Sequence, residues 1–339
     1  MFKFIKIMII IFIILFIIAF VLVCWFSFGK APEQKNIVWG VDFSQMQAES
    51  LKLDWKKNYL ALIDDLGARN IKIHTQWDFV EGKKGEYYFD DIDWQIKEAE
   101  KRNVKIIYVV GLKTGRWPEC HQPKWVDALT ESEQQDEILR YVETIVVRYK
   151  NSKAILAWQA ENEPLFKFGV CPNWYYQDKD FLKKEVALIK KLDPARQVYI
   201  SDSGEQSTWF GAAQIGDKVG TTMYRKVWAH FFDGIGLYFD SYLTPMFYWR
   251  KAQIIKWIFG KEVICVELQA EPWAEKLFYD VSLTEQEKSM DLVQFKDNIE
   301  FAKKTGLKEF YFWGAEWWYW LKEVQGKPEI WNEAKKLFK

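Results

Sequence analysis

Hydrophobic and polar positions change their spacing in a regular order along the chain. Short runs of β-branched and other apolar residues alternate with longer segments in which apolar residues return every three or four positions. The first pattern is typical of buried strands and the second of amphipathic helices. We expect helices at 55–66, 133–149, 183–192 and 285–304, and a last helix after Pro328. We expect strands at 38–43, 71–75, 104–111, 155–160, 198–201, 219–223, 263–267 and 309–313.

This alternation predicts an α/β fold with a parallel sheet. Gly67, Asn103 and Gly306 lie near predicted helix ends, where a left-handed residue commonly closes a helix. No glycine-rich phosphate loop follows the first strand, which disfavours an open, doubly wound nucleotide-binding sheet. Eight strands that alternate with helices over roughly 300 residues favour a closed (β/α)₈ TIM barrel instead.

The amino terminus has a different pattern from the rest of the chain. An unbroken apolar run covers 7–28 and follows two lysines. At about 1.5 Å per residue, a helix of this length crosses a hydrocarbon core of about 30 Å. We therefore expect a single-pass signal anchor over 1–30, a linker over 31–36 and an extracytoplasmic barrel domain over 37–339. A cleaved signal peptide is the alternative, although its apolar region is usually shorter.

Composition narrows the possible classes of function. Acidic and basic residues balance at 47 each, so no basic face indicates nucleic-acid binding. Three histidines and four scattered cysteines form no metal-binding pattern, and no cofactor is implied. Tryptophan occurs 19 times, and its flat face stacks on the apolar faces of sugar rings. We expect a monomeric domain with a carbohydrate partner.

Polar and aromatic side chains gather directly after the predicted strands. In a parallel barrel the carboxyl ends of the strands meet on one face, and active sites of this fold lie there. Most of these loops carry a tryptophan, an arrangement typical of a carbohydrate cleft. The candidate site residues at these positions are Asp42, His74, Trp77, Asn162, Glu163, Tyr224, Glu267, Glu271 and Trp313.

Two glutamates carry the chemistry that this cleft predicts. Glu163 follows the fourth strand in Asn162-Glu163-Pro164, and Glu267 ends the seventh strand after Val266. Hydrolysis of an acetal needs one carboxyl to protonate the leaving oxygen, and a second to attack the anomeric carbon or activate water there. The fourth and seventh strands face each other across a barrel mouth, so we expect these two carboxyls to meet.

In these motifs the chain resembles clan A of the glycoside hydrolases, which are retaining enzymes on (β/α)₈ barrels and include cellulases. The Asn-Glu pair at 162–163 matches the acid/base motif of the clan, and Val266-Glu267 matches its nucleophile motif. The segments 77–81 and 85–90 resemble the strand-two loop of its β-galactosidases and β-xylosidases. The resemblance covers nearly the whole barrel. It implies a retaining O-glycosidase, and the predicted signal anchor places its expected poly- or oligosaccharide substrate outside the cell.

The resemblance also implies roles for the residues around the two glutamates. Asn162 is expected to bind the 2-hydroxyl of the sugar at the cleavage point, and Trp313 to form the floor of the same subsite. Tyr224 is expected to hydrogen-bond the nucleophile. Many clan members hold the nucleophile with an arginine on strand two, and this chain offers Lys72 or His74 there instead.

Other candidates near the strand ends leave alternatives open. Asp42 is a substrate ligand or a helix cap. Glu271 binds substrate or competes with Glu267 for the role of nucleophile. We favour Glu267, because it shares the alternation of Cys265 with the barrel interior, whereas Glu271 lies beyond the end of the strand. Trp77 is expected to contact substrate.

Cys120 and Cys171 are expected to form a disulfide. They fall in the loops after the neighbouring strands three and four, on the same face of the barrel and outside the membrane. Cys265 lies within the seventh strand and is expected to stay a buried thiol.

Two rival functions share these features. A non-catalytic carbohydrate-binding or cell-surface protein has the same fold without cleavage. A transglycosylase in exopolysaccharide processing has the same site and differs in its acceptor. The presence of both glutamates favours catalysis over binding alone.

Overall fold

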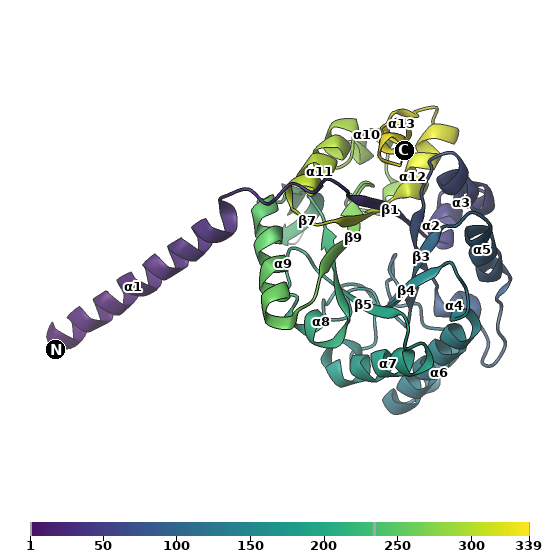
Figure 1. Ribbon diagram of the computed structural model, residues 1–339, viewed down its shortest axis with the longest axis horizontal. Helices are drawn as coiled ribbons and strands as arrows, with labels where there is room; N and C mark the ends of the chain where they lie inside the picture. Colours follow the sequence, from purple (N-terminus) through teal and green to yellow (C-terminus); the bar gives the residue numbers. More distant parts are fainter. Residues whose placement is uncertain (1, 233–234, 339) are drawn as a thin grey trace.

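In a computed structural model that describes residues 2–232 and 235–338, the chain forms a closed barrel of eight parallel strands (Figure 1). Around the barrel, hydrogen-bonded neighbouring strands follow the order β1-β10-β9-β6-β5-β4-β3-β2, and β2 pairs with β1 to close it. The predicted TIM barrel and its eight predicted strands are confirmed. The strands are β1 (Val38–Phe43), β2 (Asn70–His74), β3 (Lys105–Val110), β4 (Ile155–Ala160), β5 (Gln197–Asp202), β6 (Lys218–Met223), β9 (Val263–Gln269) and β10 (Glu309–Trp313).

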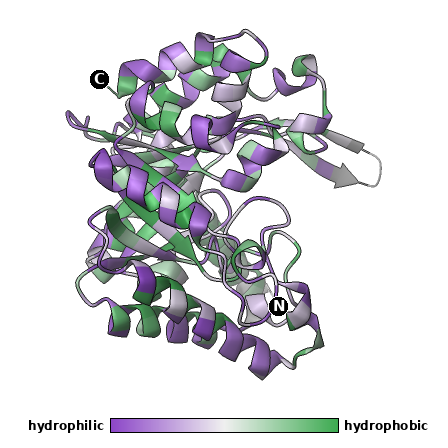
Figure 2. Ribbon diagram, turned by 90° about the vertical axis from the view of Figure 1, so that its right-hand side faces the viewer, coloured by the Kyte–Doolittle hydropathy of each residue, from purple (hydrophilic) through white to green (hydrophobic). Residues whose placement is uncertain are grey.

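Helices surround the barrel and carry both hydrophilic and hydrophobic residues, as their amphipathic pattern requires (Figure 2). The longer helices are α3 (Trp55–Asp64), α5 (Asp90–Lys101), α6 (Glu131–Tyr149), α7 (Lys179–Leu192), α9 (Pro245–Phe259), α11 (Leu292–Lys304) and α12 (Ala315–Glu323). The shorter ones are α2 (Gln45–Ser50), α4 (Trp77–Val80), α8 (Phe210–Ile215), α10 (Leu283–Gln286) and α13 (Glu329–Ala334). Single 3₁₀ turns are η1 (Lys124–Ala128), η2 (Tyr175–Gln177), η3 (Phe278–Asp280) and η4 (Lys335–Leu337).

Apolar side chains fill two separate regions. The larger cluster joins strand and helix residues and lies between the barrel and its helices. The smaller cluster contains strand residues only, so it fills the inside of the barrel beneath the carboxyl face. Its members are Ile107, Ala157, Tyr199, Ile264, Val266 and Tyr311.

One predicted helix, 285–304, is interrupted in the structure. α10 ends at Gln286, and α11 begins after Asp291, whose carboxylate caps it by accepting the N–H of Gln294 at 2.7 Å. Ser289 in the break is fully buried, and its hydroxyl accepts the N–H of Trp273 at 3.0 Å. The apolar pattern continues through the break because the buried residues there pack in the core, so periodicity alone predicted one helix.

The segment between β6 and α9 folds as an antiparallel hairpin that the sequence reasoning did not predict. Its strands are β7 (Lys226–Phe232) and β8 (Ile235–Asp240), and they form a sheet separate from the barrel. Trp228 and Tyr238 pair across the two strands with ring centroids 5.1 Å apart. The hairpin stands out from the barrel, on the right in Figure 2.

A long apolar helix precedes the barrel. α1 (Phe2–Ser27) projects away from it, on the left in Figure 1, and its Phe4–Ser27 part is long and apolar enough to cross a membrane. Its last turn meets the barrel domain, where the ring centroids of Phe26 and Phe247 lie 5.6 Å apart. The guanidinium of Arg250 in α9 lies 4.4 Å from the ring centroid of Trp25. The apolar segment is therefore one continuous helix that ends against α9.

Candidate active site

A cleft of about 400 Å³ opens where the strands end on the carboxyl face of the barrel. Glu163 and Glu267 both line it, together with Asn162, Tyr224 and Trp313. A concave site with convergent carboxyls and aromatic walls suits a carbohydrate ligand. The other aromatic residues of its wall are Phe166, Phe168, Trp228, Phe239, Tyr242 and Trp273.

Glu267 is held through both oxygens of its carboxylate. The Nζ of Lys72 on β2 lies 3.1 Å from Oε1, and the hydroxyl of Tyr224 donates to Oε2 at 2.8 Å. Burial by itself would raise the pKa of Glu267, but Lys72 and Tyr224 outweigh it and lower that pKa below its usual range. Glu267 is therefore ionised at neutral pH, as a nucleophile must be.

Lys72 belongs to a buried network beneath Glu267. Its Nζ lies 3.0 Å from Oδ1 of Asp42, and Nε2 of His74 lies 2.9 Å from the same oxygen. Burial raises the pKa of Asp42 to about 7, although Lys72 opposes the rise. The structure therefore places Asp42 and His74 behind Glu267. Ser44, not Asp42, caps α2.

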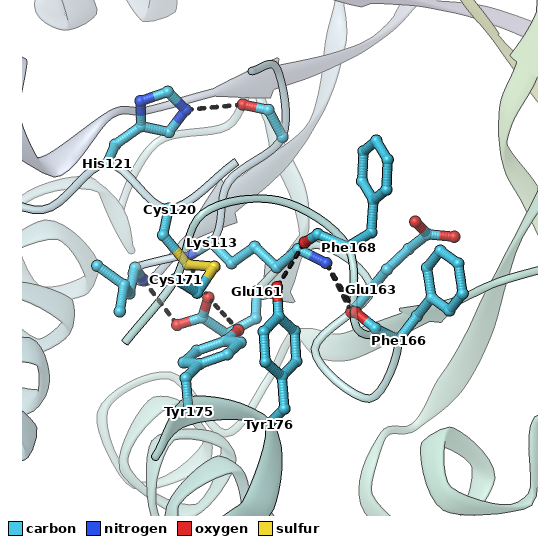
Figure 3. Close-up of a disulfide and its surroundings, with 12 residues drawn as sticks. Lys113, Cys120, His121, Glu161, Glu163, Phe166, Phe168, Cys171, Tyr175 and Tyr176 are labelled. Atoms are coloured by element: carbon cyan, nitrogen blue, oxygen red, sulfur yellow. Dashed lines mark hydrogen bonds between the residues drawn. A yellow bond between two sulfur atoms is a disulfide. The ribbon is translucent and has the colours of Figure 1, made fainter. Parts of the chain in front are cut away.

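Glu163 follows β4 with a strained backbone that its neighbours hold in place. Its φ is +44°, in the left-handed region, and its N–H donates to the hydroxyl of Ser201 at 2.8 Å. The Nζ of Lys113 donates to its carbonyl at 3.0 Å (Figure 3). The hydroxyl of Thr222 donates to its carboxyl at 3.0 Å. These contacts from three other strands or loops aim the carboxyl into the cleft.

The pKa values of the two glutamates shift in opposite directions. Burial, followed by repulsion from Glu267, raises the pKa of Glu163 well above its usual range. A protonated carboxyl beside an ionised one is the arrangement that acid catalysis of glycoside cleavage needs. Glu119 is a third buried carboxyl on the cleft wall, and burial raises its pKa to about 7. Among the residues that the structure describes, no group of three or more His, Cys, Asp or Glu is placed to hold a metal ion.

Glu271 lies apart from the cleft wall and pairs with Arg116. The alternation argument that favoured Glu267 was wrong in its premise. Cys265, a free buried thiol, packs toward the helices, whereas Val266 belongs to the cluster inside the barrel. A register shift between β9 and β6 at this point inserts an extra residue, and such a bulge reorients the next side chain. Glu267 therefore points inward because of the bulge.

Three aromatic candidates have different surroundings. Trp313 lies on the cleft wall, 5.3 Å from the ring of His74, and Tyr224 lies there as well. Trp77 is not brought to the cleft. Its ring is fully buried and stacks on Tyr141, and its N–H donates to Glu81 at 2.9 Å. A tryptophan directly after a strand end fits both a cleft and a core, so its position alone did not separate the two.

The loop after β3 supplies site residues that the sequence reasoning missed. Arg116 forms ion pairs with Glu271 and Glu316, and its guanidinium lies 3.9 Å from the ring centroid of Trp313. Arg116 and Glu119 both have left-handed φ angles, of +68° and +80°. In the sequence, only the position of this loop after a barrel strand, on the carboxyl face, could have indicated that Arg116 and Glu119 belong to the site.

A disulfide and a buried carboxylate fix this loop (Figure 3). Cys120 and Cys171 are bonded with their Cα atoms 5.2 Å apart, so the loops after β3 and β4 are joined. Glu161 accepts the backbone N–H groups of Leu112 and Lys113 at 2.7 and 2.5 Å. The glutamate two positions before Glu163 thus supports the site from behind.

The chain is similar in sequence to several glycoside hydrolases. It is 30% identical over 125 residues to mannan endo-1,4-β-mannosidase A of Podospora anserina, which covers 33% of this chain and 31% of that protein. It is 25% identical over 131 residues to endo-1,4-β-xylanase 2 of Claviceps purpurea, which covers 38% of each. The matches therefore span about a third of the length of these relatives. No protein-family model matches the chain.

The fold is shared with solved structures over nearly the whole chain. Xylanase 10B from Thermotoga maritima superposes with a TM-score of 0.57 at 15% identity, covering 89% of this chain and 95% of the xylanase. The chain is therefore a homologue of glycosidases that are named as mannanases and xylanases. The resemblance seen in the sequence motifs is confirmed. In this homologue, the Asn-Glu pair and the second glutamate lie on the walls of one cleft.

Proposed function

We propose that the chain is a retaining glycoside hydrolase in which Glu163 is the acid/base and Glu267 the nucleophile. The observation that carries the proposal is that two carboxyls of one cleft have pKa values shifted in opposite directions. At neutral pH one is ready to give a proton and the other to attack. The sequence relatives, which are named as glycosidases, support the same reaction class.

The reaction proceeds in two steps in this proposal. In the first step Glu267 attacks the anomeric carbon, the glycosidic C–O bond breaks, and Glu163 gives its proton to the leaving oxygen. In the second step Glu163 takes a proton from water, the water oxygen attacks the anomeric carbon, and the bond to Glu267 breaks. The sugar is released with the anomeric configuration that it had in the substrate.

Three neighbouring residues support the proposed reaction. Tyr224, whose hydroxyl donates to Glu267 at 2.8 Å, positions the nucleophile. Asn162 adjoins Glu163 on the cleft wall and is proposed to bind the 2-hydroxyl of the attacked sugar. Trp313 lies on the wall of the same cleft and is proposed to form the floor of the subsite that holds this sugar.

The proposed substrates are β-linked poly- or oligosaccharides outside the cell membrane. The relatives are named as mannosidases, xylanases and β-galactosidases, so β-mannosides, β-xylosides and β-galactosides are the first to test. The apolar α1 is proposed as an uncleaved single-pass anchor that leaves the barrel on the extracytoplasmic side.

Azide rescue tests the role of Glu163. We expect Glu163→Ala to lower kcat on poor leaving groups by about 10²–10⁴-fold, because the leaving oxygen is no longer protonated. Aryl glycosides with good leaving groups should still form the intermediate. Added azide, which needs no base, should then restore turnover and give the β-glycosyl azide from a β-substrate.

Glu267→Ala is the matched control for this experiment. Azide that replaces the nucleophile attacks from the opposite face and gives the α-glycosyl azide. A β-azide from Glu267→Ala, or an equal loss on all substrates without rescue in Glu163→Ala, contradicts the assignment. A mechanism-based fluorosugar should label Glu267, and labelling of Glu271 would refute its role.

A further inference from the structure

One side of the catalytic pair is covered by residues 111–123, here called the β3 loop. Its base is fixed, because Leu112 and Lys113 donate their N–H groups to Glu161 and Cys120 is bonded to Cys171. Residues 111–116 are all buried. The β3 loop is therefore a fixed wall of the barrel mouth on this side.

Arg116 connects the β3 loop to the loops on the opposite side of the barrel mouth. Its side chain is 5% exposed, and it reaches from the β3 loop to Glu271 after β9 and Glu316 after β10. Its guanidinium also covers the ring of Trp313 at 3.9 Å. Three loops are thus joined across the mouth, and separating them would leave buried charges without partners.

The ends of β1 and β2 lie beneath this closure. The side chains of Asp42, Lys72 and His74 are at most 1% exposed. Among the described residues, the cleft wall includes none of these three. It includes Trp313 and Glu119 and continues past β4, β5 and β6 to the hairpin. A glycan that extended past Glu267 toward β1 would have to displace the Arg116 contacts.

The reaction chemistry identifies which end of the substrate meets the closure. The nucleophile must reach the anomeric carbon of the sugar that it binds, and the acid must reach the oxygen that leaves. Glu267 contacts Lys72, whose Nζ lies 5.5 Å from the ring centroid of Trp313, on the closed side. The carboxyl of Glu163 contacts Thr222 on the side where the cleft is open, whereas Lys113 of the β3 loop contacts its backbone carbonyl. The attacked sugar therefore lies at the closed end.

We infer that the chain removes single sugar residues from the non-reducing end of its glycan, a mode of action that rests on the proposed glycosidase function. The closed end holds the one sugar that Glu267 attacks. The rest of the glycan is the leaving group and lies along the open side, where Phe166, Phe168 and Trp273 offer faces for stacking. This exo action differs from the endo action in the names of the mannosidase and xylanase relatives.

Product analysis of the unmodified chain tests the inference. The probes are 4-nitrophenyl β-mannoside, β-xyloside and β-galactoside, the matching biosides, and linear oligosaccharides labelled at the reducing end. We expect monosaccharide as the only first product, and labelled chains that shorten by one sugar at a time. Oligosaccharides blocked at the non-reducing sugar should resist cleavage. Internal cleavage of blocked chains would overturn the exo inference alone, whereas no hydrolysis of any of these aryl glycosides and oligosaccharides would refute the proposed function and the inference with it.

Arg116→Ala tests the structural cause. Opening the closure should raise direct release of 4-nitrophenol from the bioside, relative to the monoside, by about tenfold or more. Arg148→Ala is the matched control, because Arg148 also pairs with a carboxylate, Asp93, and stacks on a ring, Phe89, but lies away from the cleft. In Arg148→Ala the release of 4-nitrophenol from the bioside relative to the monoside should stay as it is in the unmodified chain. An unchanged ratio in a folded Arg116→Ala would exclude Arg116 as the cause, and the product analysis decides the mode of action if that variant does not fold.

Discussion

At the scale of single residues, Lys72 is one of the two residues that the sequence offered in place of the strand-two arginine of many clan members, and it is the one that contacts Glu267. An ammonium is a compact charge, whereas a guanidinium can contact two oxygens of a carboxylate at once. Lys72 contacts only Oε1 of Glu267, and the hydroxyl of Tyr224 contacts Oε2. The second contact of Lys72, to Asp42, holds the ammonium in place. The two residues together thus replace one bidentate contact.

This arrangement predicts a shift in the pH profile of Lys72→Met. The proposed reaction needs Glu267 ionised, so activity is expected to fall as the pH drops through the pKa of Glu267. Lys72 is the strongest of the groups that lower this pKa, and its loss leaves burial unopposed and raises the pKa. The acidic limb of kcat/KM should move to higher pH, and kcat at neutral pH should fall about 100-fold.

Two variants separate this effect from general damage. Lys72→Arg keeps the charge and should move the acidic limb less than Lys72→Met. Lys251→Met removes another buried lysine, which donates to the carbonyls of Gly204 and Ser207 and does not contact Glu267. Its acidic limb should match that of the unmodified chain. An acidic limb that does not move in Lys72→Met would show that Lys72 does not set the pKa of the nucleophile.

At the scale of elements, the barrel strands were predictable and the loops between them were not. A buried strand appears in the sequence as an apolar run, so all eight were found, and the two glutamates were found because they follow such runs. The disulfide of the β3 loop was predicted, but the rest of its conformation depends on distant partners, among them Glu161 and Glu271, which local spacing does not reveal. Arg116 and Glu119 were missed for that reason. The bulge in β9 likewise depends on pairing with β6 and β10.

The disulfide gives the β3 loop a stability that can be measured. It closes a chain segment of 51 residues, and loss of such a crosslink typically costs about 2–4 kcal/mol. We expect the double variant Cys120→Ser and Cys171→Ser to unfold about 5–10 °C below the unmodified chain in thermal denaturation. It should also lose activity, because Lys113 and Glu119 lie in the same loop.

The response to a reductant provides the control. Reductant should lower the melting temperature of the unmodified chain and of Cys265→Ala, whose thiol is free, but leave the double variant unchanged. Labelling of both Cys120 and Cys171 by a maleimide in the folded, unreduced chain would show that the bond does not form.

At the scale of the whole molecule, α1 and the cleft occupy different parts of the fold. α1 meets the barrel domain through its last turn, against the flank formed by α9, and projects sideways in Figure 1. The cleft wall, as the structure describes it, includes no residue of α1. Membrane attachment on this flank is therefore compatible with a cleft that stays open to a large glycan.

This separation predicts that attachment and activity can be divided. The full chain should stay in the membrane fraction through an alkaline carbonate wash, because α1 provides a predominantly apolar span of 24 residues for the bilayer. A chain that begins at Ala31 should be soluble and hydrolyse aryl glycosides at the rate of the full chain. Ile14→Arg places a charge near the middle of α1, at a cost of about 2.5–3.5 kcal/mol of insertion free energy, and should weaken attachment without changing that rate.

The proposed extracytoplasmic position of the barrel has a separate test. Protease added outside intact cells should digest the barrel. A mature chain recovered from the medium, with an intact mass that lacks α1, would show that the segment is a cleaved signal peptide instead.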